Sequence, residues 1–250
     1  MRTVIVCGGS KGIGAASAKI LINKGFNVIC VSRSTGMLTR DILENEKFRL
    51  IICDLSRQDE RSSLITELEK IENIWGIVNN ASGPLTGPSE SASKKEYLLA
   101  FETHLFASDE ILKAILPVMK KNKKGRVVNI ISVTARVPLE NMGVSNTLRG
   151  AMLNWSKTLS KELGKHGITV NNVLPGYTET ERLIEVIDGV SSKMGIEKSE
   201  YSNKLISQIP MNRFGRPEEI GAVVGFLISD DSSFVNGVSI PVDGGWTPCP

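Results

Sequence analysis

The strongest constraint on the fold is a regular alternation of short aliphatic runs with longer segments of helical period. Seven runs are rich in Val, Ile and Leu, at 3–7, 27–31, 49–53, 74–79, 126–131, 168–174 and 238–242. Such nearly continuous apolar runs are typical of parallel strands covered on both faces. Segments near 14–23, 58–71, 94–121, 146–164 and 217–229 have helical spacing. The sequence therefore predicts one doubly wound α/β domain over residues 1–250, with a seven-stranded parallel sheet.

Composition excludes several classes of protein. The net charge is only +3 and aromatic residues make up 5%, which does not favour a nucleic-acid surface. No apolar run approaches the roughly 18 residues needed to cross a bilayer. The first residues enter a strand without the features of a signal peptide. We therefore expect a cytoplasmic protein that binds neither nucleic acid nor membrane.

The four cysteines point to a reducing location. Cys7, Cys30 and Cys53 lie in or at the ends of apolar runs, and Cys249 is next to last. No Cys-x-x-Cys pair occurs and only two histidines are present, so metal or redox chemistry is the weaker interpretation. Buried free thiols and no metal site are expected.

A glycine-rich turn joins the first strand to the first helix. It consists of Gly8, Gly9, Ser10, Lys11, Gly12, Ile13 and Gly14. Glycines let the backbone turn sharply and approach a pyrophosphate, whose charge is met by the helix N-terminus. Lys11 precedes Gly12 instead of following a glycine, so the turn is not a P-loop. This position in the alternating pattern predicts a dinucleotide site.

The end of the second strand indicates which dinucleotide is bound. No Asp or Glu precedes Asp41, so no carboxylate is available there for a ribose 2′-hydroxyl. Arg33 and Lys11 are placed to flank a 2′-phosphate instead, and ordinary surface cations are the weaker alternative. The sequence predicts NADP(H) in preference to NAD(H).

One segment interrupts the alternation. Between Pro175 and Pro210 there are two amphipathic stretches and no strand, with apolar residues at Leu183, Ile184, Val186, Ile187, Tyr201, Leu205, Ile206 and Ile209. The segment follows the carboxyl end of a strand, where open α/β sheets bind ligands. A substrate lid at about 177–210 and an ordinary packed helical excursion are both consistent with this pattern.

These features resemble the short-chain dehydrogenase/reductases, particularly their 3-oxoacyl-[acyl-carrier-protein]-reductase-like branch, along essentially the whole chain. The further motifs are Asp54-Leu55, Asn79-Asn80-Ala81-Ser82, Pro175-Gly176 through Thr178 and Thr180, and Val242-Asp243-Gly244-Gly245. The resemblance implies a Rossmann-type fold in which Asp54 binds the adenine and Thr180 lies beside the nicotinamide. Cys7 and Ser82 replace the family's usual threonine and glycine.

The catalytic positions depart from the family pattern. The family uses Tyr-x-x-x-Lys, a serine and an asparagine, but no Tyr-x-x-x-Lys occurs in this chain. Counting back from Ser156 without gaps places Ser145 at the tyrosine and Arg149 at the lysine. His104 takes the asparagine position and Ser132 keeps the serine. This Ser-x-x-x-Arg arrangement resembles an atypical branch of the family.

The substituted residues suggest an altered proton path. Arg149 can donate to ribose hydroxyls but does not deprotonate. His104 has an ordinary pKa near 6.5, so we hypothesise that it donates the proton, directly or through water or Ser145. Ser132 and Ser145 would then bind the carbonyl. Alternatively, His104 is a helix-interface residue hydrogen-bonded to a neighbour.

The sequence is consistent with two functions. The first is an oxidoreductase that moves hydride between NADPH and a carbonyl or hydroxyl of a small or acyl-type substrate. The second is a non-catalytic NADP(H)-binding homologue, such as a sensor or an assembly partner. The resemblance also implies a homotetramer (or homodimer), with the helices near 94–121 and 146–164 at the main interface.

Overall fold

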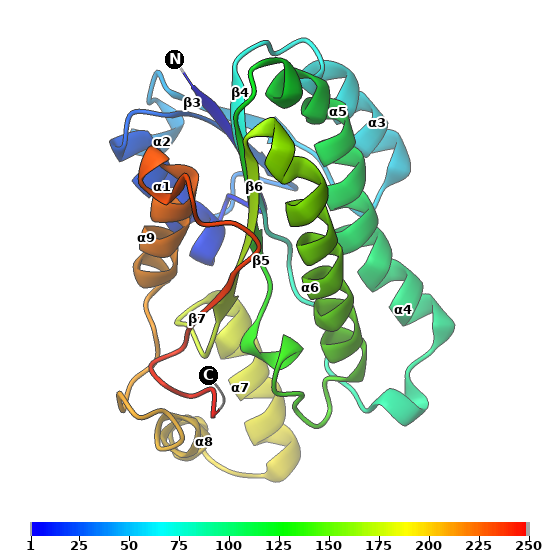
Figure 1. The fold of residues 1–250 in the computed structure, drawn as a ribbon. Helices are drawn as coiled ribbons and strands as arrows, with labels where there is room; N and C mark the ends of the chain where they lie inside the picture. Colours follow the sequence, from blue (N-terminus) through cyan, green and yellow to red (C-terminus); the bar gives the residue numbers. More distant parts are fainter. Residues whose placement is uncertain (1, 249–250) are drawn as a thin grey trace.

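The computed structural model describes residues 2–248 and contains a single seven-stranded sheet flanked by helices (Figure 1). The strands are β1 (Thr3–Cys7), β2 (Asn27–Ser32), β3 (Phe48–Ile52), β4 (Ile74–Asn79), β5 (Gly125–Ile130), β6 (Ile168–Pro175) and β7 (Ser239–Val242). Their order is β3-β2-β1-β4-β5-β6-β7, and every pair is parallel. The predicted doubly wound sheet is therefore confirmed. The order reverses between β1 and β4, where such sheets bind ligands.

Helices cover both faces of the sheet. They are α1 (Gly12–Asn23), α2 (Arg40–Leu43), α3 (Gln58–Leu68), α4 (Lys94–Phe101), α5 (Ala107–Lys121), α6 (Gly143–Leu163), α7 (Glu181–Met194), α8 (Lys198–Ile206) and α9 (Pro217–Ile228). Alternate residues of a strand point to opposite faces. Accordingly Val4 and Val6 pack with α1 and α9, while Ile5 and Cys7 pack with α3 and α5.

The predicted helix over 94–121 contains an irregular turn. A π-helical segment, Glu102–Phe106, joins α4 to α5. Such wide turns are rare and frequently lie at functional sites. Here the turn carries His104, which is buried, between two ordinary helices.

The segment without strands forms α7 and α8 at one end of the molecule (Figure 1). Leu183 and Ile187 of α7 pack with Leu205 of α8 in a small separate core. Ile184 does not belong to this face, because 59% of it is exposed. The two amphipathic stretches are thus helices with a core of their own.

The prediction of buried free thiols is confirmed for the described cysteines. Cys7, Cys30 and Cys53 are buried free thiols, and Cys249 lies outside the part of the chain that the structure describes. Burial raises the pKa of Cys30 to about 12 and that of Cys53 to about 11, so both thiols are protonated. Among residues 2–248 there is no group of three potential metal ligands of the His, Cys, Asp or Glu type. Within the same range, no helix has the length and apolarity to span a bilayer.

Candidate active site

The glycine-rich turn leaves no room for side chains. A Cβ on Gly14 would lie 2.1 Å from the Gly8 carbonyl oxygen, and Gly8 and Gly12 have φ values of +59° and +52°. Asn80 Nδ2 donates to the Gly8 oxygen at 3.1 Å and ties the ends of β4 and β1 together. The turn is therefore a tight backbone cradle that only glycines can form.

The N-terminus of α1 fits an anion. Its capping position is Lys11, whose side chain makes no cap hydrogen bond, and no acidic residue stands in the first turn. The N–H groups that open a helix lack partners within it and carry a partial positive charge. Gly12, Ile13 and Gly14 begin this turn, and Ser10 is buried just before it. These residues fit the pyrophosphate of a dinucleotide.

Two of the residues predicted for the adenosine side lie at the ends of β2 and β3. Arg33 is exposed after β2, and Asp54 follows β3 with the buried Leu55 beside it. Burial acts to raise the pKa of Asp54, but hydrogen bonds from Ser56 N and Oγ and the charge of Arg33 lower it overall. Lys11 is placed differently, because its ammonium pairs with the Glu181 carboxylate of α7.

The segment after β6 contacts the glycine-rich turn. Thr180 caps α7 by accepting from Leu183 N at 3.3 Å, and Thr178 Oγ1 donates to the Gly176 oxygen at 3.1 Å. A Cβ on Gly12 would stand 3.1 Å from Thr180 Cγ2. The structure thus brings Thr180, at the end of the segment predicted as the nicotinamide side, against the predicted phosphate cradle.

The hydroxyl proton of Ser132 has no acceptor among the residues that the structure describes. It follows β5, and its Oγ accepts from Thr134 N at 3.1 Å and from Thr134 Oγ1 at 3.0 Å. Both lone pairs are therefore engaged, and no acceptor for its proton occurs among residues 2–248. Ser132 is a fixed hydrogen-bond donor.

Ser145 and Arg149 lie one turn apart on α6, and both are buried. Arg149 Nη1 donates to the Ile130 oxygen at 3.2 Å, while its buried Nε has no hydrogen-bond partner. Burial and the neighbouring charge of Arg182 lower the pKa of Arg149 to about 10. The guanidinium is still charged at neutral pH. Ile131 and Val133, which flank Ser132, share a hydrophobic cluster with Val144 and Leu148.

His104 is held in the neutral form. Its Nε2 lies 3.0 Å from the Ser82 carbonyl oxygen, so Nε2 carries the hydrogen and Nδ1 is an acceptor. Burial, and next the charge of Arg149, lower the pKa of His104 to about 3. The imidazolium donor expected from its ordinary pKa is not populated at pH 7. This geometry favours the alternative, a helix residue hydrogen-bonded to a neighbour.

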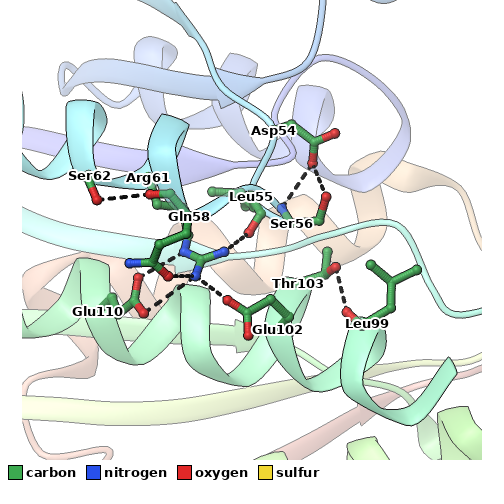
Figure 2. A network of polar contacts seen from close by, with 10 residues as sticks. All are labelled: Asp54, Leu55, Ser56, Gln58, Arg61, Ser62, Leu99, Glu102, Thr103 and Glu110. Carbon is green, nitrogen blue, oxygen red and sulfur yellow. Dashed lines mark hydrogen bonds and ion pairs between the residues drawn. The ribbon is translucent and has the colours of Figure 1, made fainter. Parts of the chain in front are cut away.

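A buried ion network links this region to the Asp54 turn (Figure 2). Arg61 of α3 donates to the Leu55 oxygen at 2.7 Å and to Glu110 at 2.9 Å, and it also pairs with Glu102 at the start of the π-helical segment. Figure 2 shows the guanidinium between the two carboxylates. The network fixes the wide turn that carries His104.

Three groups at this site were not predicted from the sequence: Thr134, the Arg61 network and Arg182. Arg182 Nη2 donates to the Pro84 oxygen at 2.8 Å, beside Ser82. A signal for Arg182 existed, because it follows Thr180, a residue of the motif that resembles the family, by two positions. For Arg61 there was none, since the two carboxylates that it pairs with are 41 and 49 residues away.

Comparisons with known proteins agree with the geometry. The family described as Enoyl-(Acyl carrier protein) reductase matches residues 8–247. The NADPH-dependent reductase BacG of Bacillus subtilis (strain 168) is 31% identical over 254 residues, covering 98% of this chain and 97% of the relative. The 3-oxoacyl-[acyl-carrier-protein] reductase FabG of Haemophilus influenzae is also 31% identical, with coverages of 98% and 97%.

A solved structure matches along its whole length. YwfH, described as an NADPH-dependent reductase involved in bacilysin biosynthesis, has a TM-score of 0.90 and 27% identity, covering 100% of this chain and 99% of that one. The chain therefore belongs to the short-chain dehydrogenase/reductase family of oxidoreductases.

Proposed function

We propose that this protein is an NADP(H)-dependent reductase that moves hydride between the nicotinamide and a carbonyl or hydroxyl of a small or acyl-type substrate. The observation that carries the proposal is that the hydroxyl proton of Ser132 has no acceptor among residues 2–248. Ser132 follows β5, which is separated in the sheet by β4 alone from β1, the strand that leads into the glycine-rich turn. A cofactor cradle and a fixed donor for a substrate oxygen are the two parts that carbonyl reduction needs.

The preference for NADP(H) is supported by charge. Arg33 is an exposed cation at the end of β2, where no carboxylate stands to receive a ribose hydroxyl. Its planar guanidinium suits a 2′-phosphate. Gly8–Gly14 would hold the pyrophosphate, Asp54 and Leu55 the adenine, and Asn80, Ala81 and Ser82 the inner ribose. Pro175, Gly176, Thr178 and Thr180 would hold the carboxamide. When bound, the nicotinamide supplies or accepts the hydride.

The residues of the chain handle the oxygen and its proton. Ser132 and Ser145 donate to the substrate oxygen, and the nearby charge of Arg149 stabilises the negative charge that develops on it. Neither serine is acidic enough to be the final proton source, so the proton comes from water through these hydroxyls. His104, neutral at pH 7, holds the Ser82 turn in place.

A second candidate function is favoured by the same histidine. Neither His104 nor Arg149 has a pKa near neutrality, because that of His104 lies at about 3 and that of Arg149 at about 10. General acid catalysis works best with a pKa near the working pH. A non-catalytic NADP(H)-binding sensor or assembly partner would have no need of such a group.

Titration with NADPH and NADH, followed by fluorescence, tests the cofactor proposal. We expect tighter binding of NADPH. Arg33→Ala should weaken NADPH about 10- to 100-fold, the effect of one charge-assisted contact, and leave NADH unchanged. Arg40→Ala, an exposed cation of α2, is the control. Binding of neither nucleotide would contradict both candidate functions.

Turnover separates the two candidates. Carbonyl-dependent oxidation of NADPH should fall about 10²- to 10³-fold in Ser132→Ala, the usual loss for an oxyanion donor, with NADPH affinity unchanged. Tight NADPH binding without turnover across a broad carbonyl panel would favour the non-catalytic candidate.

We also propose a homotetramer (or homodimer) and a cytoplasmic location. Leu98, Leu99 and Phe106 support the assembly, because they are large apolar side chains exposed on α4 and the π-helical segment. The three buried free thiols fit a reducing compartment.

A further inference from the structure

Arg149 is a buried cation with no carboxylate partner in the part of the chain that the structure describes. Its side chain makes one hydrogen bond to a backbone carbonyl, its Nε is unsatisfied, and no ion pair to it occurs among residues 2–248. A buried charge is costly unless it is paired and hydrogen-bonded. Arg61 provides the comparison within this chain, since it is equally enclosed but has two carboxylates and a carbonyl around it.

A second guanidinium converges on the same place. A Cβ built on Gly83 would lie 3.7 Å from Arg149 Nη2 and 3.9 Å from Arg182 Nε, with no other non-neighbouring heavy atom within 4 Å. Arg182 is held there by the Pro84 oxygen, and within residues 2–248 its only carboxylate contact is Glu185 at 3.3 Å, which is mostly exposed. The space beside Gly83 is therefore lined by nitrogens of two cations.

Without a bound anion, the closeness of the Arg149 and Arg182 guanidiniums is electrostatically unfavourable. Like charges at short distance repel, and partial burial strengthens the repulsion. Burial is the main cause of the lowered pKa of Arg149, and the charge of Arg182 lowers it further. An anion placed between the two guanidiniums would remove the repulsion and accept hydrogen bonds from the nitrogens that line this space, Arg149 Nη2 and Arg182 Nε. A planar carboxylate matches the guanidinium fork.

We propose that Arg149 and Arg182 bind a carboxylate of the substrate, so that the substrates are oxo acids and not neutral carbonyl compounds. This proposal rests on the proposed reductase function and specifies its substrate class. The position agrees with that role, because Arg149 also contacts the end of β5 two residues before Ser132. In the reaction the carbonyl carbon gains hydride and its oxygen a proton, NADPH becomes NADP⁺, and the carboxylate is unchanged.

A binding experiment tests the site without turnover. Pentanoate and its neutral isostere pentanamide are titrated by calorimetry into protein saturated with NADP⁺. We expect pentanoate to bind at least about 10-fold more tightly than pentanamide, and Arg182→Leu to weaken pentanoate about 10- to 100-fold. Arg182→Lys should recover part of the loss. Lys193→Leu, an exposed cation of the same helix, is the matched control and should change nothing.

Three outcomes of the titration would overturn the proposal. Equal binding of pentanamide, or no binding of pentanoate, would show that no carboxylate is recognised. Tighter binding of inorganic phosphate than of pentanoate would assign the site to another oxyanion. A loss of NADPH affinity in Arg182→Leu as large as the loss for pentanoate would assign the arginines to the cofactor.

Turnover of paired substrates then separates the substrate class from the reductase function. The series 2-oxobutanoate, 3-oxobutanoate, 4-oxopentanoate and 5-oxohexanoate is compared with the corresponding methyl esters. We expect KM to be lower for the acid than for its ester at the best spacing, and this advantage to disappear in Arg182→Leu. Equal KM values for acids and esters would refute the proposal. Pentanoate binding that needs Arg182, without reduction of any acid, would support the anion site while the reductase function failed.

Discussion

A buried histidine that stays neutral makes this protein sensitive to acid. The pKa of His104 is about 3 in the folded state and near 6.5 in an unfolded chain, so the unfolded state binds more protons between these values. The contribution of His104 to the free energy of unfolding should therefore be fully present above pH 6.5. It should fall as the pH is lowered toward 3, by at most about 1.4 kcal/mol per pH unit from this residue. Urea unfolding at pH 7.5, 5.5 and 4.5 measures it.

Replacing His104 separates its contribution from that of the other titratable groups. His104→Asn should make the free energy of unfolding less dependent on pH between 7.5 and 4.5 than it is in the wild type. An equal pH slope in wild type and His104→Asn would mean that His104 is not buried in its neutral form.

His104 illustrates which properties of the site could be predicted from the sequence and which could not. Ser132, Asp54 and the glycine-rich turn follow strands directly, so their place at one edge of the sheet could be predicted from strand positions. The ionisation of His104 could not, because it depends on burial and on Arg149, 45 residues away in sequence. Arg149 itself was identified, but not its lack of a carboxylate partner among residues 2–248, which only packing determines.

At the scale of elements, Arg61 joins α3 to the π-helical segment and α5. Its side chain is fully buried, while Glu102 and Glu110 are about one-third exposed. Arg61→Met should lower the free energy of unfolding by about 2–4 kcal/mol, because two carboxylates lose their buried cation. The loss is limited because both carboxylates remain partly hydrated. Urea unfolding checks this. Arg57→Met removes the exposed ion pairs of Arg57 with Asp59 and Glu60, one helical turn before Arg61, and should have little effect.

A partial rescue would identify the cause. Adding Glu102→Gln and Glu110→Gln to Arg61→Met removes the uncompensated charges and should restore part of the lost stability. If the triple variant is no more stable than Arg61→Met, the loss comes from packing and not from charge.

The elements differ in how far sequence determines them. Strands with continuous Val and Ile were predicted to within one or two residues, because burial on both faces demands that composition. The four-residue α2 carries too short a pattern to be recognised. Glu102 and His104 of the π-helical turn contact residues that are distant in sequence, and helical periodicity over 94–121 does not reveal such contacts.

The contact between α7 and the glycine-rich turn predicts a change in cofactor affinity. Lys11 and Glu181 form a partly exposed ion pair. Glu181→Gln should free Lys11 for a 2′-phosphate and remove a negative charge, strengthening NADPH binding about 2- to 5-fold, with less effect on NADH. Fluorescence titration at low salt measures this, and high salt should reduce the difference. Asp188→Asn, which breaks an exposed pair of the same helix, is the control. Unchanged NADPH affinity would mean that Lys11 does not reach the cofactor.

At the scale of the whole molecule, the site is assembled from segments spread over most of the chain. Ser82 follows β4, His104 stands between α4 and α5, Ser132 follows β5, Arg149 lies on α6 and Arg182 on α7. The sheet brings the strand ends together, while the helices approach from the surface. Anything that holds α4, α5 and α6 in place therefore also holds the site.

An assembly through these helices would provide such support. Leu98 and Leu99 of α4 are 54% and 53% exposed, and Phe106 is 43% exposed, which is costly in water for a monomer. We expect the wild type to sediment as a tetramer or dimer, and Leu98→Glu with Leu99→Glu to sediment as a smaller species, because charges would enter an apolar interface. Met37→Glu, an exposed apolar residue elsewhere, should leave the assembly intact. A wild-type monomer at micromolar concentration would contradict the assembly. If the smaller species also loses carbonyl reduction while keeping NADPH affinity, the interface supports the substrate side of the site.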